Sequence, residues 1–281
     1  MNTYQCVRPD CKLQVYAKGN ATSGIGILFL HGGPGSGAQA IMELPAFQRL
    51  EEFFHCTYFD QRGCGASSYP IEKGIKMEDI IADVEAVAKD LKQRWNLNYL
   101  FLWGGSFGGY LASLCMERIH GIFDGCMLSS PAITFSRKQA MEMYEHMKTP
   151  YEQRMPALSE QALSSDVDTP EAFFQNPMIR DFIFSEKNNS NSLRHICAMS
   201  SWFFQHHFPN LFTNLPVPTL VLQGKDDPIC KYEVLDKQLE KHKHPNLTYF
   251  LLPGAGHAVF QDKEDDFVKY IKAFIEEVSA C

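Results

Sequence analysis

The sequence lacks the features that mark membrane, secreted and nucleic-acid-binding proteins. No apolar stretch approaches the roughly 18 residues that are needed to span a bilayer. The opening residues, Met1 to Arg8, lack the apolar core of a signal peptide. There is no run of Lys and Arg, and 33 acidic side chains against 26 basic ones give a formal net charge of −7. We therefore expect a cytoplasmic protein that binds neither nucleic acid nor membrane.

Cysteines are present, but their pattern indicates neither a disulfide framework nor a metal site. Their number, nine, is odd, and several lie singly in apolar runs, which is typical of reduced cysteines in a protein core. Cys6 and Cys11 have four residues between them, and no second Cys/His pair at zinc spacing accompanies them. We expect no metal and no cofactor, and the sequence does not indicate an oligomeric state.

The chain does contain short apolar runs that alternate with amphipathic stretches. Its 281 residues suit one large α/β domain, or a core domain with an insertion. Strands alternating with helices predict a mostly parallel sheet with helices on both faces. The predicted strands are 2–7, 11–17, 25–30, 56–59, 99–103, 125–128, 218–222 and 247–252, and the predicted helices include 47–54, 77–95, 231–243 and 263–278.

The residue pattern of the sequence changes between residues 132 and 214. Strand-like runs disappear there, and charged, methionine and aromatic residues mix, as in 141–147 and 201–208. We interpret 132–214 as a helical insertion, or cap, in a core domain made of 1–131 and 215–281. Because ligands of parallel sheets bind beyond the carboxyl ends of the strands, we expect the site at that edge.

The strongest motif surrounds Ser106. The stretch from Tyr99 to Gly109 runs through apolar residues into a glycine-flanked serine, and a helical pattern follows. Gly104-x-Ser106-x-Gly108 between a strand and a helix is typical of a nucleophile elbow, in which a strained backbone pushes the serine Oγ out of the turn. Glycines are needed at both flanking positions because strand and helix pass too closely for side chains. The alternative interpretation is a glycine-rich turn with an idle serine.

A nucleophilic serine needs a general base, and the base needs an acid that orients it. In the chain order Ser, acid, His, the acid lies in Gly224-Lys-Asp-Asp-Pro228, where Asp226 and Asp227 are both possible. We favour Asp227 from its spacing after the glycine, and Asp226 would then be a loop carboxylate. His257 follows a glycine-rich loop after the next predicted strand and is our candidate base. The other nine histidines, His31 among them, lack that placement.

Acyl transfer also builds negative charge on the substrate's carbonyl oxygen. N–H donors must stabilise this charge through hydrogen bonds. The residue after the nucleophile, Phe107, is the first candidate donor through its backbone amide. The second is the amide of Gly33 in His31-Gly-Gly-Pro-Gly35, where glycines let the backbone approach a substrate. We expect these two amides to form an oxyanion hole.

Three motifs together resemble the prolyl aminopeptidase (proline iminopeptidase) branch of the α/β-hydrolase superfamily. They are His31-Gly-Gly-Pro-Gly35, Asp60-Gln-Arg-Gly-Cys-Gly65 and Gly104-Gly-Ser-Phe-Gly108. The resemblance covers roughly 25–131 and 215–281. It implies an α/β-hydrolase fold with a lid formed by the insertion, and a brace for the pocket in the second motif.

By the same resemblance, Ser106, Asp227 and His257 would form a catalytic triad. The family often has tryptophan after the nucleophile, where this chain has Phe107, and it grips the substrate's amino end with cap glutamates. The aromatic stretch 197–208 contains no glutamate. The candidate substrate-binding residues are therefore two acids that share a predicted helix face and two aromatic residues: Glu142, Glu145, Trp202 and Phe203.

The sequence leaves three functions open. The first is a serine hydrolase that cleaves a small amide or an N-terminal, prolyl-like residue through an acyl-enzyme, with a small molecule or short peptide as substrate. The second keeps the chemistry but acts as an esterase, lactonase or carbon–carbon hydrolase on a small neutral substrate. The third is a hydrolase fold that binds a small ligand without catalysis, for which a complete triad would have no use.

Overall fold

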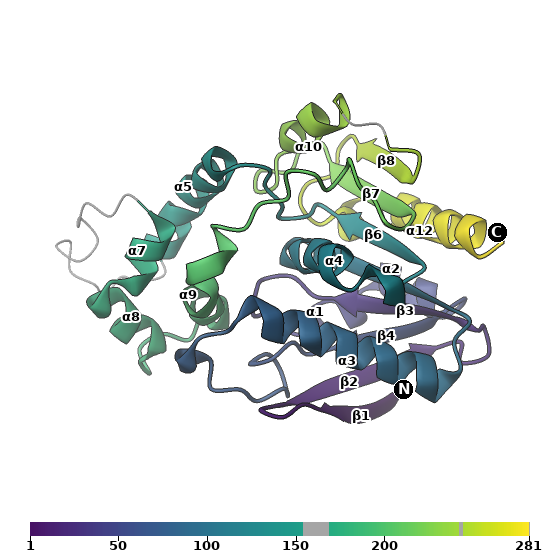
Figure 1. Cartoon of the computed structure of the whole chain (residues 1–281), viewed down its shortest axis with the longest axis horizontal. Coiled ribbons are helices and arrows are strands. Elements are labelled where there is room, and N and C mark those ends of the chain that lie inside the picture. The colour runs from purple at the N-terminus through teal and green to yellow at the C-terminus, as the bar shows by residue number, and fades with distance from the viewer. Residues whose placement is uncertain (154–168, 242–243, 281) are drawn as a thin grey trace.

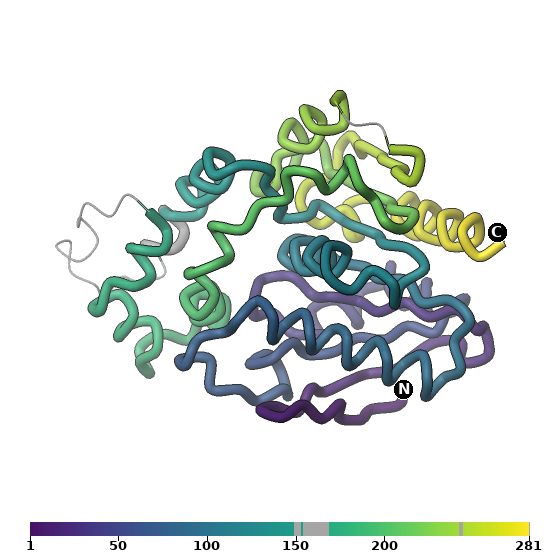
Figure 2. Tube along the Cα trace, in the orientation of Figure 1, coloured from purple at the N-terminus to yellow at the C-terminus, as the bar shows by residue number. Residues whose placement is uncertain are grey.

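The computed structural model describes residues 1–153, 169–241 and 244–280, which form a central sheet with helices on both faces (Figure 1). Within these residues, no helix is long and apolar enough to cross a membrane. The tube in Figure 2 shows that the chain leaves the sheet near residue 130, passes through several helices, and returns to the sheet near residue 219.

The sheet has eight strands within the described residues, and most neighbours are parallel. In spatial order the strands are β1 (Asn2–Val7), β2 (Lys12–Gly19), β4 (His55–Phe59), β3 (Ile25–Leu30), β5 (Tyr99–Gly105), β6 (Gly125–Ser129), β7 (Thr219–Gly224) and β8 (Leu247–Leu252). Only β2 runs antiparallel to its neighbours, β1 and β4. The carboxyl ends of β3 to β8 therefore meet at one edge, as the sequence predicted.

Helices cover the sheet on both faces, because alternate residues of each buried strand point to opposite sides. Leu28 and Leu30 belong to one apolar cluster with α3 (Met77–Trp95) and α4 (Phe107–Arg118), whereas Ile27 and Phe29 belong to another with α2 (Pro45–Glu51) and α12 (Glu264–Ser279). The helices of the core are α1 (Gln39–Met42), α2 (Pro45–Glu51), α3 (Met77–Trp95), α4 (Phe107–Arg118), α10 (Tyr232–Leu239), α11 (Val259–Asp262) and α12 (Glu264–Ser279), with short 3₁₀ turns at 71–73 and 120–122.

The predicted elements agree with the observed ones where the apolar pattern is strong. Strands β3 and β8 and helix α3 have the predicted bounds. Helix α2 begins earlier than predicted, at Pro45, because proline suits the first turn of a helix. Helix α10 ends at Leu239, four residues before the predicted end. The short helices α1 and α11 were not predicted, since four residues carry no periodicity.

Four described helices lie between β6 and β7, beside the carboxyl ends of the strands (Figure 1). They are α5 (Arg137–Gln153), α7 (Pro170–Gln175), α8 (Pro177–Phe184) and α9 (Asn191–Phe203). Within the described part of 132–214 the regular elements are helices, without strands. Residues 154–168 of that insertion lie outside the described residues.

Helix α9 joins the insertion to two loops of the core. The side-chain amide of Asn191 donates a hydrogen bond to the carbonyl oxygen of Gly35 at 2.8 Å. One turn later, His195 Nε2 lies 3.1 Å from the carbonyl oxygen of Arg62. A Cβ atom on Gly35 would lie 2.9 Å from the carbonyl oxygen of Asn191, so the glycine permits this close approach. The loops after β3 and β4 are thus covered by the insertion.

His31 holds these two loops together. Its imidazole is fully buried, and its Nε2 accepts a hydrogen bond from the Gln61 amide at 3.1 Å. The Gln61 side chain donates in return to the His31 carbonyl oxygen at 2.8 Å. Nδ1 lies 3.0 Å from the carbonyl oxygen of Gly32 and 3.3 Å from the backbone nitrogen of Gly37, so both ring nitrogens contact the backbone of these loops. His31 is therefore a structural residue of the loop that carries Gly33.

Arg62 anchors the loop that follows β4. Its guanidinium is buried and donates to both carboxylate oxygens of Asp83 in α3, at 2.7 and 2.9 Å, and to Asp10 at 3.0 Å. The Cζ atom of this guanidinium also lies 4.7 Å from the centre of the Tyr69 ring. Bidentate pairing of this kind fixes direction as well as distance. Arg62 therefore holds this loop against α3, and the brace of the pocket expected of the second motif stays a prediction.

We predict that the buried His31 makes the protein less stable in acid. Burial lowers the pKa of this imidazole from 6.5 to about 4. Between these values the unfolded chain binds a proton that the folded chain does not, so stability falls as the pH drops through this range. The loss should reach about 3 kcal/mol at pH 4.

Chemical denaturation of the wild type and His31→Gln at pH 7, 5.5 and 4 measures this effect. The free energy of unfolding of the wild type should fall toward that of the variant as the pH decreases. A constant difference between the two proteins across the three pH values would contradict this account of His31.

Candidate active site

Ser106 lies in the turn between β5 and α4, in a backbone conformation that is rare for a residue with a side chain. Its φ and ψ angles are 53° and −122°. Several hydrogen bonds hold the turn in place: the Ser106 amide donates to Ser129 O at 3.0 Å, and the amides of Gly109 and Ala132 donate to Ser106 O. Such a conformation costs about 1–3 kcal/mol and persists where the surroundings fix it. The structure therefore contains the strained turn that the sequence pattern predicts.

The two glycines of this turn are needed for different contacts. A Cβ atom on Gly104 would collide with the carbonyl oxygen of Gly108, where the strand turns back into the helix. A Cβ atom on Gly108 would instead collide with the carbonyl oxygen of Leu30 at the end of β3. The glycine at 108 thus lets α4 begin directly against the loop that carries Gly33. That contact comes from β3, which the sequence pattern alone did not indicate.

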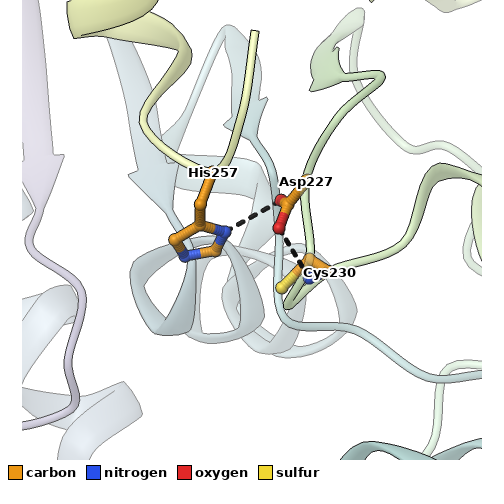
Figure 3. Close-up of side chains that lie close together, drawn as sticks. All are labelled: Asp227, Cys230 and His257. Atoms are coloured by element: carbon orange, nitrogen blue, oxygen red, sulfur yellow. Dashed lines mark hydrogen bonds and ion pairs between the residues drawn. The ribbon is translucent and has the colours of Figure 1, made fainter.

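His257 and Asp227 form a hydrogen-bonded pair at the ends of β8 and β7. His257 Nδ1 lies 2.8 Å from Asp227 Oδ2, as Figure 3 shows. The other carboxylate oxygen, Oδ1, accepts hydrogen bonds from the amides of Ile229 at 2.8 Å and Cys230 at 2.9 Å. Burial opposes the charge of Asp227, but these hydrogen bonds outweigh it and keep the pKa of the carboxyl below its ordinary value. The pair is therefore a carboxylate that fixes the orientation of an imidazole.

The structure distinguishes the two aspartates that the sequence left open. The side chain of Asp227 is fully buried and reaches His257, whereas Asp226 is exposed in the loop. The backbone amide of Asp226 donates to the carbonyl oxygen of Ala255 at 2.9 Å. A Cβ atom on Gly224 would collide with the carbonyl oxygen of Gly256. This close contact between the loops after β7 and β8 brings Asp227 and His257 together.

Ser106 and His257 line the same cavity, which has a volume of about 520 Å³. Gly33 and Phe107 line it as well. Phe107 is the first residue of α4, where backbone N–H groups have no acceptor within the helix, and Gly33 has a φ angle of 113°. Between β6 and β7 the chain contributes the apolar side chains of Met143, Met147, Ile196 and Phe203 to the lining, together with His146 and Ser192.

The four candidate substrate-binding residues differ in their placement. Phe203 lines the cavity. The preceding residue, Trp202, instead donates its ring N–H to the carbonyl oxygen of Ile75 at 2.7 Å. Glu142 and Glu145 are exposed on α5, and Glu142 lies 3.8 Å from Lys138. Among the described residues, neither acid nor Trp202 lines the cavity with Ser106. The face of α5 that meets the cavity is the one with Met143 and Met147.

These methionines are functional candidates that the sequence reasoning did not select. The mixed stretch 141–147 contains both, and its helical spacing offered two faces, one acidic and one apolar. Methionine side chains are unbranched and flexible, so a cavity wall made of them can adapt its shape. The apolar face of this predicted helix could have identified them, because an apolar helix face must pack against another part of the protein.

One group of side chains in the described residues has atoms close enough to hold a metal ion. It consists of Asp227, Cys230 and His257, whose potential ligand atoms lie within 4.8 Å of one another (Figure 3). Burial raises the pKa of the Cys230 thiol well above its usual range, which disfavours the thiolate that binds metals. The carboxylate and the imidazole are also already paired with each other. The arrangement fits acid–base chemistry better than metal binding.

The fold and the motifs agree with comparisons to known proteins. The chain is 26% identical over 272 residues to the proline iminopeptidase PfmaB of Pestalotiopsis fici, and the match covers 89% of this chain and 92% of the relative. The solved structure of a proline iminopeptidase-related protein from Thermus thermophilus superposes with a TM-score of 0.69 at 19% identity, over 99% and 98% of the two chains. An esterase from Thermogutta terrifontis gives 0.68 at 20% identity, over 99% of each chain.

These neighbours confirm the predicted α/β-hydrolase fold and the resemblance to proline iminopeptidases. Because the sequence identity of the structural matches is only 20% and 19%, they show similarity of the fold alone. The family model described as serine aminopeptidase S33 matches residues 27–264, which include Ser106, Asp227 and His257. Because this match spans most of the sequence, the chain belongs to the serine aminopeptidase S33 family of α/β hydrolases.

Proposed function

We propose that the chain is a serine hydrolase that works through an acyl-enzyme. In this proposal Ser106 is the nucleophile, His257 is the general base and Asp227 orients the imidazole. The observation that carries it is the pairing of the buried Asp227 with His257, which shares a cavity with a serine in a strained turn. Membership of the S33 family supports the same chemistry.

In the first half of the reaction, Ser106 Oγ attacks the carbonyl carbon of the substrate and passes its proton to His257 Nε2. Asp227 accepts the hydrogen bond from Nδ1–H and so keeps Nε2 free to receive that proton. The imidazolium then gives the proton to the leaving group as the bond to the acyl carbon breaks. In the second half, water takes the place of the serine and releases the acid.

The negative charge on the carbonyl oxygen would be met by the amides of Gly33 and Phe107. The two residues line the cavity on the side of the loop after β3 and at the start of α4. Loss of one such donor typically costs about 3 kcal/mol of transition-state stabilisation. His31 and Gln61 contribute indirectly, because they hold the loop that carries Gly33.

The substrate that best suits the cavity is a small ester or amide without a charge on its acyl part. In its described lining there is no Asp, Glu, Lys or Arg, and the insertion contributes mainly methionine, isoleucine and phenylalanine. An ammonium group held there without a carboxylate would lose its hydration uncompensated. We propose that residues 132–214 act as a cap that selects such neutral substrates.

The second candidate is removal of an N-terminal residue such as proline. The S33 family and the proline iminopeptidase relatives favour it. It requires a carboxylate for the free amine, and the exposed acids Glu142 and Glu145 would have to turn toward the cavity to supply one. The chemistry at Ser106 would be the same in both cases.

We predict that an activated phosphonate labels the protein once, at Ser106, and that Ser106→Ala abolishes labelling. Intact-mass and peptide mass spectrometry measure the adduct. Ser113, which is buried and donates to Gly109 O, provides the control: Ser113→Ala should keep full labelling. Labelling that survives Ser106→Ala would overturn the assignment of the nucleophile.

We predict that Asp227→Asn lowers kcat by up to about 10⁴, because an amide favours the wrong tautomer of the imidazole. The matched control is the neighbouring substitution Asp226→Asn, which removes an exposed carboxylate and should change kcat by less than about threefold. Steady-state kinetics with one aryl ester compares them. Equal losses in the two variants would remove Asp227 from its proposed role.

We predict that a short aryl ester and an N-acetyl-proline arylamide are better substrates than the free proline arylamide. The physical reason is the cost of placing an unpaired ammonium in the apolar cavity. Values of kcat/KM for the three compounds decide between the two substrate classes. A clear preference for the free amine would reject the neutral-substrate proposal and favour the aminopeptidase, with the triad chemistry unchanged.

A further inference from the structure

The loop that carries Asp227 closes around one buried side chain, that of Gln223. Gln223 is the residue before Gly224 in β7 and is fully buried. Its amide nitrogen, Nε2, donates to the carbonyl oxygen of Cys230 at 2.8 Å and to that of Gly224 at 3.0 Å. The same nitrogen donates to Asp227 Oδ2 at 3.4 Å. One side-chain nitrogen thus contacts the beginning, the middle and the end of the loop 224–230.

The three acceptors determine the orientation of this amide. An amide oxygen in the place of Nε2 would face two carbonyl oxygens and a carboxylate, so the nitrogen has to occupy that place. This orientation leaves the amide oxygen of Gln223 without a donor among the described residues, which is unfavourable for a buried acceptor. The contacts of the nitrogen therefore decide how the side chain lies, and the loop requires N–H donors from residue 223.

The two halves of this loop are held in different ways. The amides of Lys225 and Asp226 donate to carbonyl oxygens at the end of β8 and in the loop after it, at 3.1 and 2.9 Å. In the second half, two backbone amides turn back to Asp227 Oδ1. Those bonds shape the turn, but they do not attach it to the sheet. The hydrogen bond from Gln223 to the carbonyl oxygen of Cys230 supplies that attachment.

The amide of Gln223 also completes the surroundings of the Asp227 carboxylate. Oδ1 accepts from the amides of Ile229 and Cys230, while Oδ2 accepts from His257 Nδ1 at 2.8 Å, as Figure 3 shows, and from Gln223. An ionised carboxylate has about four acceptor positions, so four donors can occupy all of them. Rotation of this carboxylate would break several hydrogen bonds at once. The contact with Gln223 is the longest of the four, so we expect a moderate effect on the rate.

We propose that Gln223 is a positioning residue for the reaction at Ser106. Its amide holds the loop 224–230 to the end of β7 and keeps Asp227 in the orientation in which Oδ2 accepts the hydrogen bond from His257. Gln223 acts on Ser106 only through these two residues. The inference rests on the proposed function, because it concerns the acid of the same site.

The first test is the kinetics of Gln223→Met with an aryl ester. Methionine has a similar length but no N–H group, so Asp227 should lose part of its fixed orientation. We expect kcat to fall by about tenfold, while KM stays within about twofold because the cavity around Ser106 keeps its lining. Steady-state kinetics measures both constants.

Leu222→Met is the matched control for this substitution. Leu222 precedes Gln223 in β7, is fully buried, and belongs to the apolar cluster on the other face of the sheet. The exchange of leucine for methionine nearly conserves volume and leaves the loop 224–230 untouched. Its kcat should stay within about twofold of the wild type.

A double-mutant cycle separates positioning from a general loss of structure. In Asp227→Ala there is no carboxylate to orient, so the addition of Gln223→Met should slow phosphonate labelling of Ser106 by less than about twofold. In the wild-type background the same substitution should slow labelling by about tenfold. Mass spectrometry follows the adduct over hours, so the slow background can be measured. If Gln223→Met does not fold, the cycle uses Gln223→Glu, which keeps the shape of the side chain.

Unchanged kcat in the Gln223 variant would overturn the proposal. Equal slowing of labelling with and without the Asp227 carboxylate would mean that Gln223 serves the fold alone, and would overturn it as well. In either case, labelling of Ser106 and ester hydrolysis by the wild type would still support the proposed function. Absence of both in the wild type would instead contradict the proposed function itself.

Discussion

The hydrogen bond between His257 and Asp227 is the interaction on which the rest of the site depends. The loops after β7 and β8 must approach within van der Waals contact to form it, and glycine at position 224 makes that approach possible. Two backbone amides fix the carboxylate, so it presents one oxygen to the imidazole. The bond thus turns an ordinary imidazole into one with a defined tautomer, which is what a base for Ser106 requires.

The proposed reaction centre and an apolar wall opposite it lie at the same edge of the sheet. Ser106, the loop of Gly33 and the Asp227–His257 pair come from strand ends whose backbones are hydrogen-bonded to one another. The opposite wall comes from α5 and α9 and consists largely of apolar side chains. In the proposed function, the loops at the strand ends would therefore carry out the reaction, and the helices between β6 and β7 would select the substrate.

The strained turn at Ser106 and the pairing of Asp227 with His257 could be located from the sequence, whereas the cavity wall could not. Gly104, Ser106 and Gly108 form a local pattern with one steric meaning, and chain order directs attention to His257. Such patterns do not depend on knowing the tertiary structure. The cavity wall does depend on it: α5 offered an acidic and an apolar face, and only packing reveals that Met143 faces the cavity. Likewise, Trp202 and Phe203 are neighbours in sequence, but Trp202 is held by Ile75 and Phe203 lines the cavity.

The central claim is that hydrolysis passes through an acyl group on Ser106. Rapid-quench kinetics with an aryl ester of a bulky, slowly released acid measures this most directly. The account predicts a burst of the aryl alcohol equal to one per protein molecule, with the acyl mass found on the peptide that contains Ser106. Turnover of the same ester without a burst, or an acyl group on any other residue, would contradict it.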